Sequence, residues 1–514
     1  MTDWLKNAIF YEIYPQSFMD TNADGIGDLQ GIIDKLDYIK SIGCNAIWVN
    51  PCFESPFMDA GYDVMDYYTI APRYGTNDDA VRLFEEAHKR DMHVLFDLVP
   101  GHTSYKHPWF EKSMLAESNE YTDRYVWTDN VWQSPEGFDA LRGISERNGS
   151  CVVNFFSSQP ALNYGFYNVT EKWQQPVDAP GPTATLDEMI NVIRFWLSKG
   201  LDGFRVDMAG SLVKNDPDSL GTIALWQKVR EFLDREFPDA AFVSEWGEPD
   251  KSLLGGFHMD FLLHFGPSHY NDLFRCEHPY FGRDGMGDAS EFLAKYIENY
   301  NKSGGKGLIC IPSGNHDMDR LSYRLDEEER KIVFAFILSM PGAPFIYYGD
   351  EIGMRFLADI KSVEGGYNRT GSRTPMQWDN SLPNSGFSTA DSDMLYIKQD
   401  DAVDRPDVLT EMNRDNSLYN EIKKLIRIRQ DNAPLTNLGS VEFINPEEKS
   451  HPLIYVRTLD GESIIVIINP FDRELDITVN MELKDRVYSY MDKDVTVSGN
   501  SIHVPGVFAG YYKL

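Results

Sequence analysis

The chain has 514 residues, of which 42% are hydrophobic and 25% are charged, and its formal net charge at pH 7 is −32. This length and composition are typical of a globular protein of two or three domains, and the apolar stretches are too short for a transmembrane helix, so we expect no membrane association. The negative charge argues against nucleic acid as a partner, because binding to nucleic acid depends on neutralising its phosphates.

Cysteine usage and the N-terminal segment bear on where the protein works. Five cysteines are scattered along the chain, at Cys44, Cys52, Cys151, Cys276 and Cys310. They form no CxxC pair, which argues against a zinc site or a disulfide framework and indicates reduced core residues. The N-terminal segment MTDWLKNAIFYEIYP lacks the features of a signal peptide, so we place the protein in the cytoplasm. We also expect a monomer or homodimer.

Eight short apolar runs follow one another along the chain, and most have the pattern of a strand buried on both faces. They are residues 8–14, 46–50, 93–99, 203–207, 241–246, 260–265, 307–311 and 344–351. Between several of these runs the apolar residues recur at helical spacing, which predicts helices over residues 28–43, 77–90, 186–199, 220–235, 288–300 and 328–339. Eight strands alternating with helices predict an α/β protein with a (β/α)8 barrel.

Two segments depart from this alternation. Residues 103–172 are rich in aromatic and polar turn residues and lie between the third and fourth strands, which predicts a small inserted subdomain. The tail from residue 434 has alternating apolar and polar residues separated by turns, which predicts a C-terminal antiparallel β-sandwich domain. We therefore assign the barrel to residues 1–102 and 173–433, the insert to residues 103–172 and the last domain to residues 434–514.

Polar residues interrupt the apolar strands at their carboxyl ends, where a barrel of this kind carries its reactive groups. These residues are Asp97 at the end of the third strand with His102 beyond it, Arg205 and Asp207 in the fourth, Glu245 in the fifth, and Asn315, His316 and Asp317 after the seventh. Arg205 and Asp207 are two residues apart on one strand, so their side chains share a face. We expect the guanidinium to lower the pKa of Asp207 and keep it ionised, as a carboxylate nucleophile requires.

By itself this pair is equally consistent with a buried structural ion pair. The carboxyl groups of Glu245 and Asp317 on neighbouring strands favour a catalytic site instead.

Five segments resemble the motifs of the α-amylase superfamily, glycoside hydrolase family 13, in order and with suitable spacing. They are DLVPGH (97–102), QPALN (159–163), GFRVD (203–207), SEW (244–246) and NHD (315–317). Two more, DTNADGIGDLQGI (20–32) and RTPMQWD (373–379), resemble the branch that holds oligo-1,6-glucosidase, α-glucosidase and trehalose synthase. The resemblance covers nearly the whole chain.

The resemblance implies a retaining glycosidase with Asp207 as the nucleophile, Glu245 as the general acid/base and Asp317 as the transition-state stabiliser. A retaining enzyme places two carboxyl groups roughly 5 Å apart, one to attack the anomeric carbon and one to protonate the leaving oxygen. Glu245 therefore has to hold a proton near neutral pH. Asp317 would bind the 2- and 3-hydroxyls of the sugar.

The resemblance also implies a set of substrate-binding residues, namely Tyr62, Asp63, His102, Arg205, His316 and Arg369. Tyr62 would stack on the sugar, and the two histidines would donate hydrogen bonds to it. Asp63 is expected to pair with Arg369 and to close the pocket beyond the terminal glucose. An enzyme with such a closed pocket would act on the ends of sugar chains.

The segment DTNADGIGD places several oxygen-bearing side chains close together, a set suited to Ca²⁺. It opens like an EF-hand loop, but its twelfth position is Gly31 rather than Glu. The resemblance supports one structural Ca²⁺, with Mg²⁺ as the alternative, held by Asp20, Asn22, Asp24, Ile26 and Asp28. No organic cofactor is expected.

Two positions depart from the family pattern. Gly101 stands where α-amylases usually carry Asn, which argues against a second Ca²⁺ between the barrel and the insert. Met208 follows the expected nucleophile and matches neither residue usual at that position, so the preferred linkage stays open.

The sequence thus predicts a retaining α-glucosidase that removes glucose from the non-reducing ends of short α-glucans or isomalto-oligosaccharides. A transglycosylase or isomerase such as trehalose synthase would use the same residues and remains an alternative. A non-catalytic sugar-binding or interaction protein on the same barrel is disfavoured, because all three carboxylates are present. The sequence has no HxH motif, which disfavours a metal-dependent hydrolase.

Overall fold

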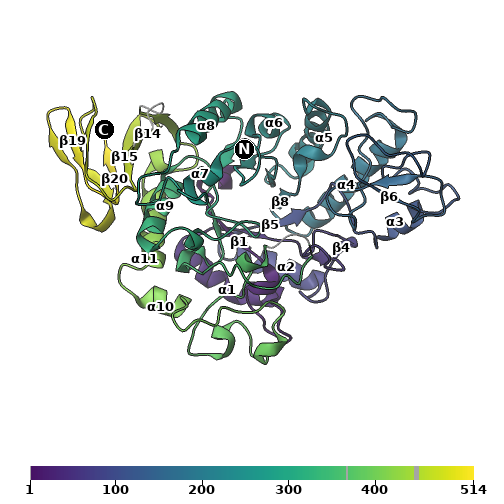
Figure 1. Cartoon of the computed structure of the whole chain (residues 1–514), viewed down its shortest axis with the longest axis horizontal. Helices are drawn as coiled ribbons and strands as arrows, with labels where there is room; N and C mark the ends of the chain where they lie inside the picture. Colours follow the sequence, from purple (N-terminus) through teal and green to yellow (C-terminus); the bar gives the residue numbers. More distant parts are fainter. Residues whose placement is uncertain (1, 366–368, 445–450) are drawn as a thin grey trace.

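The computed structural model describes residues 2–365, 369–444 and 451–514. In Figure 1 the barrel lies in the centre of an elongated molecule, with the C-terminal strands at the left and the elements of residues 103–172 at the right. The two predicted appendages therefore lie at opposite ends of the molecule.

The central sheet joins eight parallel strands of the described chain in the order β11-β10-β9-β8-β5-β2-β1-β12. Their bounds are β1 (Phe10–Ile13), β2 (Ala46–Val49), β5 (His93–Leu98), β8 (Gly203–Val206), β9 (Ala241–Ser244), β10 (Met259–Phe261), β11 (Leu308–Cys310) and β12 (Phe345–Tyr347). A parallel bridge between Pro312 and Phe345 links the two end strands, so the barrel is nearly closed. The predicted barrel is confirmed, and each strand overlaps its predicted run but is shorter than it.

All six predicted helices are present, as α1 (Leu29–Ile42), α2 (Asn77–His88), α4 (Pro180–Leu197), α5 (Leu220–Glu236), α8 (Ser290–Ser303) and α9 (Glu327–Ser339). In α1 the side chain of Asp28 accepts a hydrogen bond from the backbone N–H of Gly31 and caps the first turn. Gly43 ends the same helix in the left-handed conformation that favours glycine. Side-chain caps also start α2 and α9, whereas α4, α5 and α8 begin without one. The helical spacing of apolar residues is therefore the signal that all six share.

Several further elements were not predicted from the sequence. They are the hairpin β3 (Phe53–Glu54) and β4 (Asp66–Ile70), and the helices α6 (Pro249–Leu254), α7 (Tyr270–Phe274), α10 (Val408–Asn413) and α11 (Leu418–Asp431). Among them, α11 buries its apolar face against α9 and extends the layer of helices around the barrel.

The insert lies between β5 and α4 and contains α3 (Pro108–Ser113), β6 (Ala140–Arg142) and β7 (Ser150–Val152). It has a small hydrophobic cluster of its own, made of Val126, Val152, Ala161 and Phe166. A separate cluster explains why residues 103–172 form a subdomain rather than a long loop. The exact domain boundaries stay predictions.

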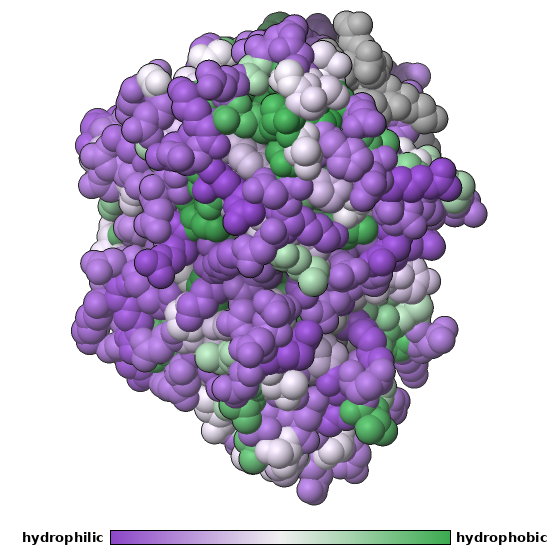
Figure 2. All heavy atoms as spheres, turned by 90° about the vertical axis from the view of Figure 1, so that its left-hand side faces the viewer, coloured by the Kyte–Doolittle hydropathy of each residue, from purple (hydrophilic) through white to green (hydrophobic). Residues whose placement is uncertain are grey.

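The C-terminal domain consists of two antiparallel sheets, as expected. One has the order β13-β14-β15-β20-β17 and the other β16-β19-β18. Their bounds are β13 (Ser440–Phe443), β14 (Leu453–Leu459), β15 (Glu462–Asn469), β16 (Leu475–Thr478), β17 (Arg486–Ser489), β18 (Thr496–Ser498), β19 (Ser501–Val504) and β20 (Phe508–Lys513). A shared cluster that includes Ile465, Ile467, Ile502 and Phe508 joins the sheets, and Figure 2 shows that the surface at this end of the molecule is mostly hydrophilic.

All five cysteines are free thiols, as predicted, and four of them are buried. Among the described residues, no helix combines the length and the apolar character needed to cross a bilayer.

Candidate active site

A cavity of about 350 Å³ lies where the carboxyl ends of the barrel strands meet. Six of the sequence-predicted residues line it, namely Tyr62, His102, Asp207, Glu245, Asp317 and Arg369. Six further residues complete the wall, namely Asp59, Phe155, Gln159, Met208, His264 and Phe265. The structure therefore brings together side chains that are up to several hundred residues apart in the sequence.

Arg205 lies behind this wall, 1% exposed, and connects three carboxyl groups. Its Nη1 is 2.6 Å from Asp97 Oδ1 and 3.1 Å from Asp207 Oδ1, and its Nη2 is 2.8 Å from Glu245 Oε1. One planar guanidinium thus fixes the relative positions of Asp207 and Glu245. The expectation that Arg205 binds substrate is corrected, because the residue supports the two carboxyl groups from behind.

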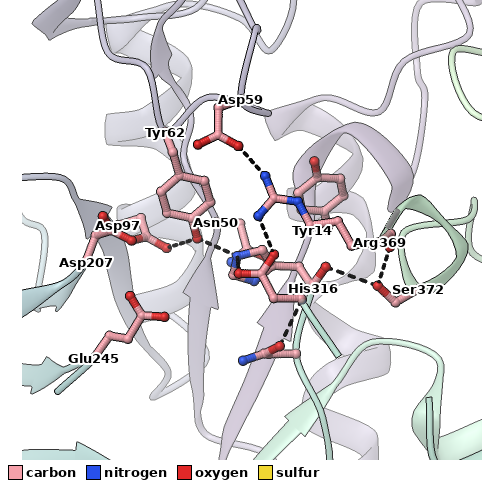
Figure 3. Close-up of polar contacts among 12 residues, drawn as sticks. Tyr14, Asn50, Asp59, Tyr62, Asp97, Asp207, Glu245, His316, Arg369 and Ser372 are labelled. Atoms are coloured by element: carbon pink, nitrogen blue, oxygen red, sulfur yellow. Dashed lines mark hydrogen bonds and ion pairs between the residues drawn. The ribbon is translucent and has the colours of Figure 1, made fainter. Parts of the chain in front are cut away.

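Asp207 and Glu245 project from the ends of neighbouring strands. Asp207 follows β8 and its backbone N–H bonds to the carbonyl oxygen of Leu98, whereas the N–H of Glu245 bonds to that of Val206. Glu245 Oε2 also accepts a hydrogen bond from the backbone N–H of Met208 at 3.0 Å. Figure 3 shows the two side chains on the same side of the site, to the left of and below the ring of Tyr62.

The expected low pKa of Asp207 is not found. Burial and the neighbouring Glu245 carboxylate raise the pKa of Asp207 well above its ordinary value, and the opposing effect of Arg205 is smaller. Burial likewise raises the pKa of Asp97 to about 6 against the effect of Arg205. Several carboxyl groups share one guanidinium, so the cluster retains a proton more strongly than an isolated ion pair would.

Asp317 has the opposite electrostatic environment. Its Oδ1 lies 2.8 Å from Arg369 Nη1 and 2.7 Å from Arg373 Nη2. Burial alone would raise the pKa of Asp317, but the two permanently charged guanidinium groups outweigh it and hold that pKa well below its usual range. Asp317 is therefore an ionised carboxylate that two ion pairs hold in place in the cavity wall.

The predicted pairing of Asp63 with Arg369 is wrong. Arg369 pairs instead with Asp59, which lines the cavity, and Figure 3 shows this contact next to Tyr62. Asp63 is fully buried and accepts hydrogen bonds from Ser55 Oγ and from the backbone N–H groups of Met58 and Asp59. The carboxylate of Asp63 shapes the turn, and this turn presents Asp59 to the arginine.

His316 has no exposed surface and lies behind the cavity wall. Its Nε2 is 2.7 Å from Tyr62 Oη, and its Nδ1 is 3.0 Å from Glu12 Oε1. Burial lowers the pKa of His316 well below its usual value. The expected direct contact with the sugar is corrected to a supporting role, in which His316 orients the ring of Tyr62.

Three cavity residues were not among those predicted, and they differ in whether the sequence could have revealed them. Gln159 begins the motif QPALN, and its Nε2 donates to Asp59 Oδ2 at 2.7 Å, so the motif could have revealed it. Phe155 and Phe265 come from loops without a recognisable pattern, and only the tertiary structure places them in one cavity.

The loop expected to hold a cation is built from successive side chain-to-backbone hydrogen bonds. The N–H groups of Asn22, Asp24 and Ile26 bond to side-chain oxygens of Asp20, Asn22 and Asp24, respectively, at 2.9–3.0 Å. Among the described residues, no group of three His, Cys, Asp or Glu side chains converges as a metal cluster. The side chains of Asp20, Asn22 and Asp24 offer carboxylate and amide oxygens, which are the type of ligand that a hard cation such as Ca²⁺ takes.

One member of that predicted ligand set, Asp28, is already engaged. Its two oxygens accept hydrogen bonds from Thr21 and from the backbone N–H of Gly31. Asp28 therefore closes the loop and caps α1. Asp20 is engaged to a similar extent, because its carboxylate accepts from the N–H groups of Asn22, Ala23 and Gly25 and from Ser388 Oγ.

Residues 12–437 match the family model described as the catalytic domain of alpha amylase. The chain belongs to the α-amylase family. The eight-stranded barrel and the C-terminal β domain agree with this membership.

Relatives within the family carry several activities. The chain is 32% identical to the trehalose synthase/amylase TreS of Mycobacterium tuberculosis, over 92% of this chain and 84% of that protein. It is 31% identical to the oligo-1,6-glucosidase of Parageobacillus thermoglucosidasius, over 97% of this chain and 95% of that protein.

Solved structures in the family are similar over the full length. A trehalulose synthase variant bound to Tris has a TM-score of 0.82 and 26% identity, over 99% of this chain and 100% of that one. An isomaltulose synthase variant from Erwinia rhapontici in complex with sucrose has a TM-score of 0.82 and 26% identity, over 100% of this chain and 99% of that one.

Proposed function

We propose that the protein is a retaining α-glucosidase that releases glucose from the non-reducing ends of short α-glucans or isomalto-oligosaccharides. The observation that carries the proposal is the bridging of Asp207 and Glu245 by the single guanidinium of Arg205 at the wall of one cavity. A retaining glycosidase needs two carboxyl groups held roughly 5 Å apart across one sugar ring. The family membership and its glucosidase relatives support the same reaction class.

In the first step, a carboxylate oxygen of Asp207 attacks the anomeric carbon while the bond to the leaving oxygen breaks. Glu245 gives its proton to that oxygen, and a glucosyl ester of Asp207 forms. Water then attacks the ester, its proton returns to Glu245, and glucose leaves with retained configuration. For this first step Glu245 has to be the protonated member of the carboxyl pair, and Asp207 has to be the ionised member.

The remaining wall residues bind the terminal glucose. Tyr62 offers a ring face to the sugar, and the fixed carboxylate of Asp317 accepts hydrogen bonds from its hydroxyl groups. The ion pair between Asp59 and Arg369 closes the pocket beyond this glucose and limits cleavage to chain ends.

Isomerisation or transglycosylation is the second candidate, and a specific feature favours it. Phe155 and Phe265 line the cavity with side chains that are 52% and 49% exposed. Such apolar rings retain the C–H face of a released sugar and exclude water. The glucosyl ester would then react with that sugar rather than with water.

We also propose one structural Ca²⁺ in the loop of residues 20–28, with Mg²⁺ as the alternative. Asp20, Asn22 and Asp24 would hold it with side-chain oxygens, Ile26 with its carbonyl oxygen, and Asp28 through the turn that it closes. The ion would stabilise the loop and take no part in the chemistry.

The proposed function is tested with maltose, isomaltose, trehalose and sucrose as separate substrates and with product analysis over time. Hydrolysis releases free glucose as the only new product from maltose or isomaltose, whereas an isomerase produces trehalose or a sucrose isomer. Asp207→Asn is expected to lower kcat by at least about 10³-fold. Unchanged turnover by this variant, or full-rate internal cleavage of an oligosaccharide blocked at its non-reducing end, would contradict the proposal.

A further inference from the structure

Asn154 belongs to the insert, just after β7, and its side-chain amide reaches residues that line the barrel cavity. Its Nδ2 lies 3.1 Å from His102 Nδ1 and 3.7 Å from Met208 Sδ. Its Oδ1 lies 3.2 Å from Lys214 Nζ. His102 and Met208 both line the cavity, so this one amide contacts two parts of its wall.

Lys214 determines which way the amide of Asn154 points. An ammonium group has three N–H donors and no acceptor, so it can face only the oxygen of the amide. Lys214 is 7% exposed and also donates to the carbonyl oxygen of Ser211 at 2.8 Å. With its oxygen held by Lys214, Asn154 presents its two N–H donors to His102 and Met208.

This orientation fixes the tautomer of His102. Because Asn154 donates to Nδ1, that nitrogen has to be unprotonated, and the ring proton lies on Nε2. Nε2 in turn donates to the carbonyl oxygen of Tyr62 at 3.1 Å. Burial lowers the pKa of His102 to about 4, which agrees with a neutral ring that only accepts at Nδ1.

Gly101 makes room for this contact. A Cβ atom at position 101 would lie 2.7 Å from Asn154 Nδ2, closer than side-chain atoms pack. The glycine that departs from the family pattern is therefore matched to the asparagine of the insert.

We propose that Asn154, oriented by Lys214, is a positioning residue of the active site that holds His102 in its neutral Nε2–H tautomer and fixes Met208 in the cavity wall. The proposal rests on the proposed function, since the two residues matter only if the cavity binds substrate. Through this amide, a residue of the insert determines which ring nitrogen of His102 donates a hydrogen bond in the cavity wall and which one accepts. Met208 adopts a left-handed backbone conformation, with φ at 42°, and the sulfur contact helps to fix its side chain.

The decisive variant is Asn154→Asp, which keeps the shape but replaces the donor with an acceptor. A carboxylate facing Nδ1 requires a proton on that nitrogen, so His102 is expected to change tautomer or to become doubly protonated at pH 7. Long-range ¹H–¹⁵N spectra of the imidazole groups report the change, with the His102 signal assigned through its loss in His102→Gln. We expect kcat/KM to fall at least about tenfold.

Asn148→Asp is the matched control, because Asn148 is an exposed residue of the same insert. It makes the same chemical change and is expected to leave both the His102 signal and kcat/KM as in the unmodified protein. If Asn154→Asp does not fold, Lys214→Met frees the amide to turn and is expected to give a mixture of His102 tautomers.

An unchanged His102 signal in Asn154→Asp, or in Lys214→Met where the first variant does not fold, would overturn the proposal. So would a kcat/KM for Asn154→Asp within twofold of the Asn148→Asp value. The imidazole spectrum does not depend on turnover, so this result is distinguishable from failure of the proposed function, which would appear as a lack of sugar products from the unmodified protein.

Discussion

Asp59 and Asp63 lie in one short turn, yet their carboxylates have different partners. Asp59 faces the cavity and pairs with Arg369, whereas Asp63 is buried under the turn and accepts backbone hydrogen bonds. The turn between them places Ala60 and Gly61 at positive φ, which separates the directions of the two side chains. No feature of the spacing in MDAGYD distinguishes these roles.

The two aspartates are expected to respond differently to the same substitution. Asp59→Asn should raise KM for a disaccharide about tenfold or more, because it removes the ion pair that we propose closes the pocket. Asp63→Asn should leave KM near its original value but lower the free energy of unfolding by about 1–3 kcal/mol, because backbone N–H groups lose an acceptor. Steady-state kinetics and urea unfolding measure both effects, and a larger KM change for Asp63→Asn would contradict the assignment.

The raised pKa of Asp207 predicts a pH dependence. Asp207 has to be ionised to attack, so kcat/KM falls as the pH is lowered through its pKa, which burial and Glu245 hold above the ordinary value. Glu245→Gln removes the neighbouring charge and should shift this acid limb to lower pH. The measurement uses α-glucosyl fluoride, whose leaving group needs no proton.

Glu248→Gln serves as the control for this shift. Glu248 lies three residues along the chain, pairs with Lys251 near the surface, and is absent from the cavity wall. Its replacement should leave the acid limb in place. An acid limb that stays fixed or moves to higher pH in Glu245→Gln would show that Glu245 does not raise the pKa of Asp207.

At the scale of secondary-structure elements, the loop of residues 20–28 connects the first strand to α1 and to a distant segment. Asp20 Oδ2 accepts hydrogen bonds from the N–H of Gly25 and from Ser388 Oγ, and Asp28 caps α1. The loop therefore ties the start of the barrel to residues near its end. A cation bound here would stabilise both segments together.

Chelation tests the proposed ion. Removing divalent cations from the Ca²⁺-loaded protein should lower Tm, since a ligand at about 100 times its Kd stabilises by about 2.7 kcal/mol. Asp24→Ala should abolish this Ca²⁺ dependence. Asp34→Ala, an exposed change on α1, should preserve it, and an equal Tm with and without chelator would argue against the site.

At the scale of the whole molecule, a buried arginine joins distant segments at the amino-terminal end of the barrel. Arg429 of α11 is 2% exposed and donates to the carbonyl oxygens of Leu338, Met340 and Gly342 and to Asn437 Oδ1. Asn437 in turn donates to the carbonyl oxygens of Leu5 and Ala8. These contacts join the N-terminal segment, the end of α9, α11 and the start of the C-terminal domain.

Replacing this arginine should weaken the whole assembly. Arg429→Met leaves several buried oxygens without a donor and should lower the free energy of unfolding by at least about 3 kcal/mol. Arg427→Met, on the exposed face of the same helix, should change it by less than about 0.5 kcal/mol. Chemical denaturation compares the two, and equal effects would show that the buried contacts do not control stability.

The fold was largely predictable because its signals are local. Apolar runs mark β1, β2, β5, β8, β9, β10, β11 and β12, and capping residues such as Asp28 and Gly43 mark the helix ends. Short elements such as α6 and the β3–β4 hairpin were missed because they have too few residues to show a periodic pattern.

The sequence by itself indicated the barrel, its two appendages, the family and the gathering of Asp207, Glu245 and Asp317 at one site, because strand patterns and motifs are written in consecutive residues. Only the tertiary structure decided that Asp59 rather than Asp63 meets Arg369, that His316 lies behind the cavity wall, and that the pKa of Asp207 is raised. Side-chain direction, burial and charge coupling depend on neighbours supplied by distant parts of the chain, and no local pattern records those neighbours.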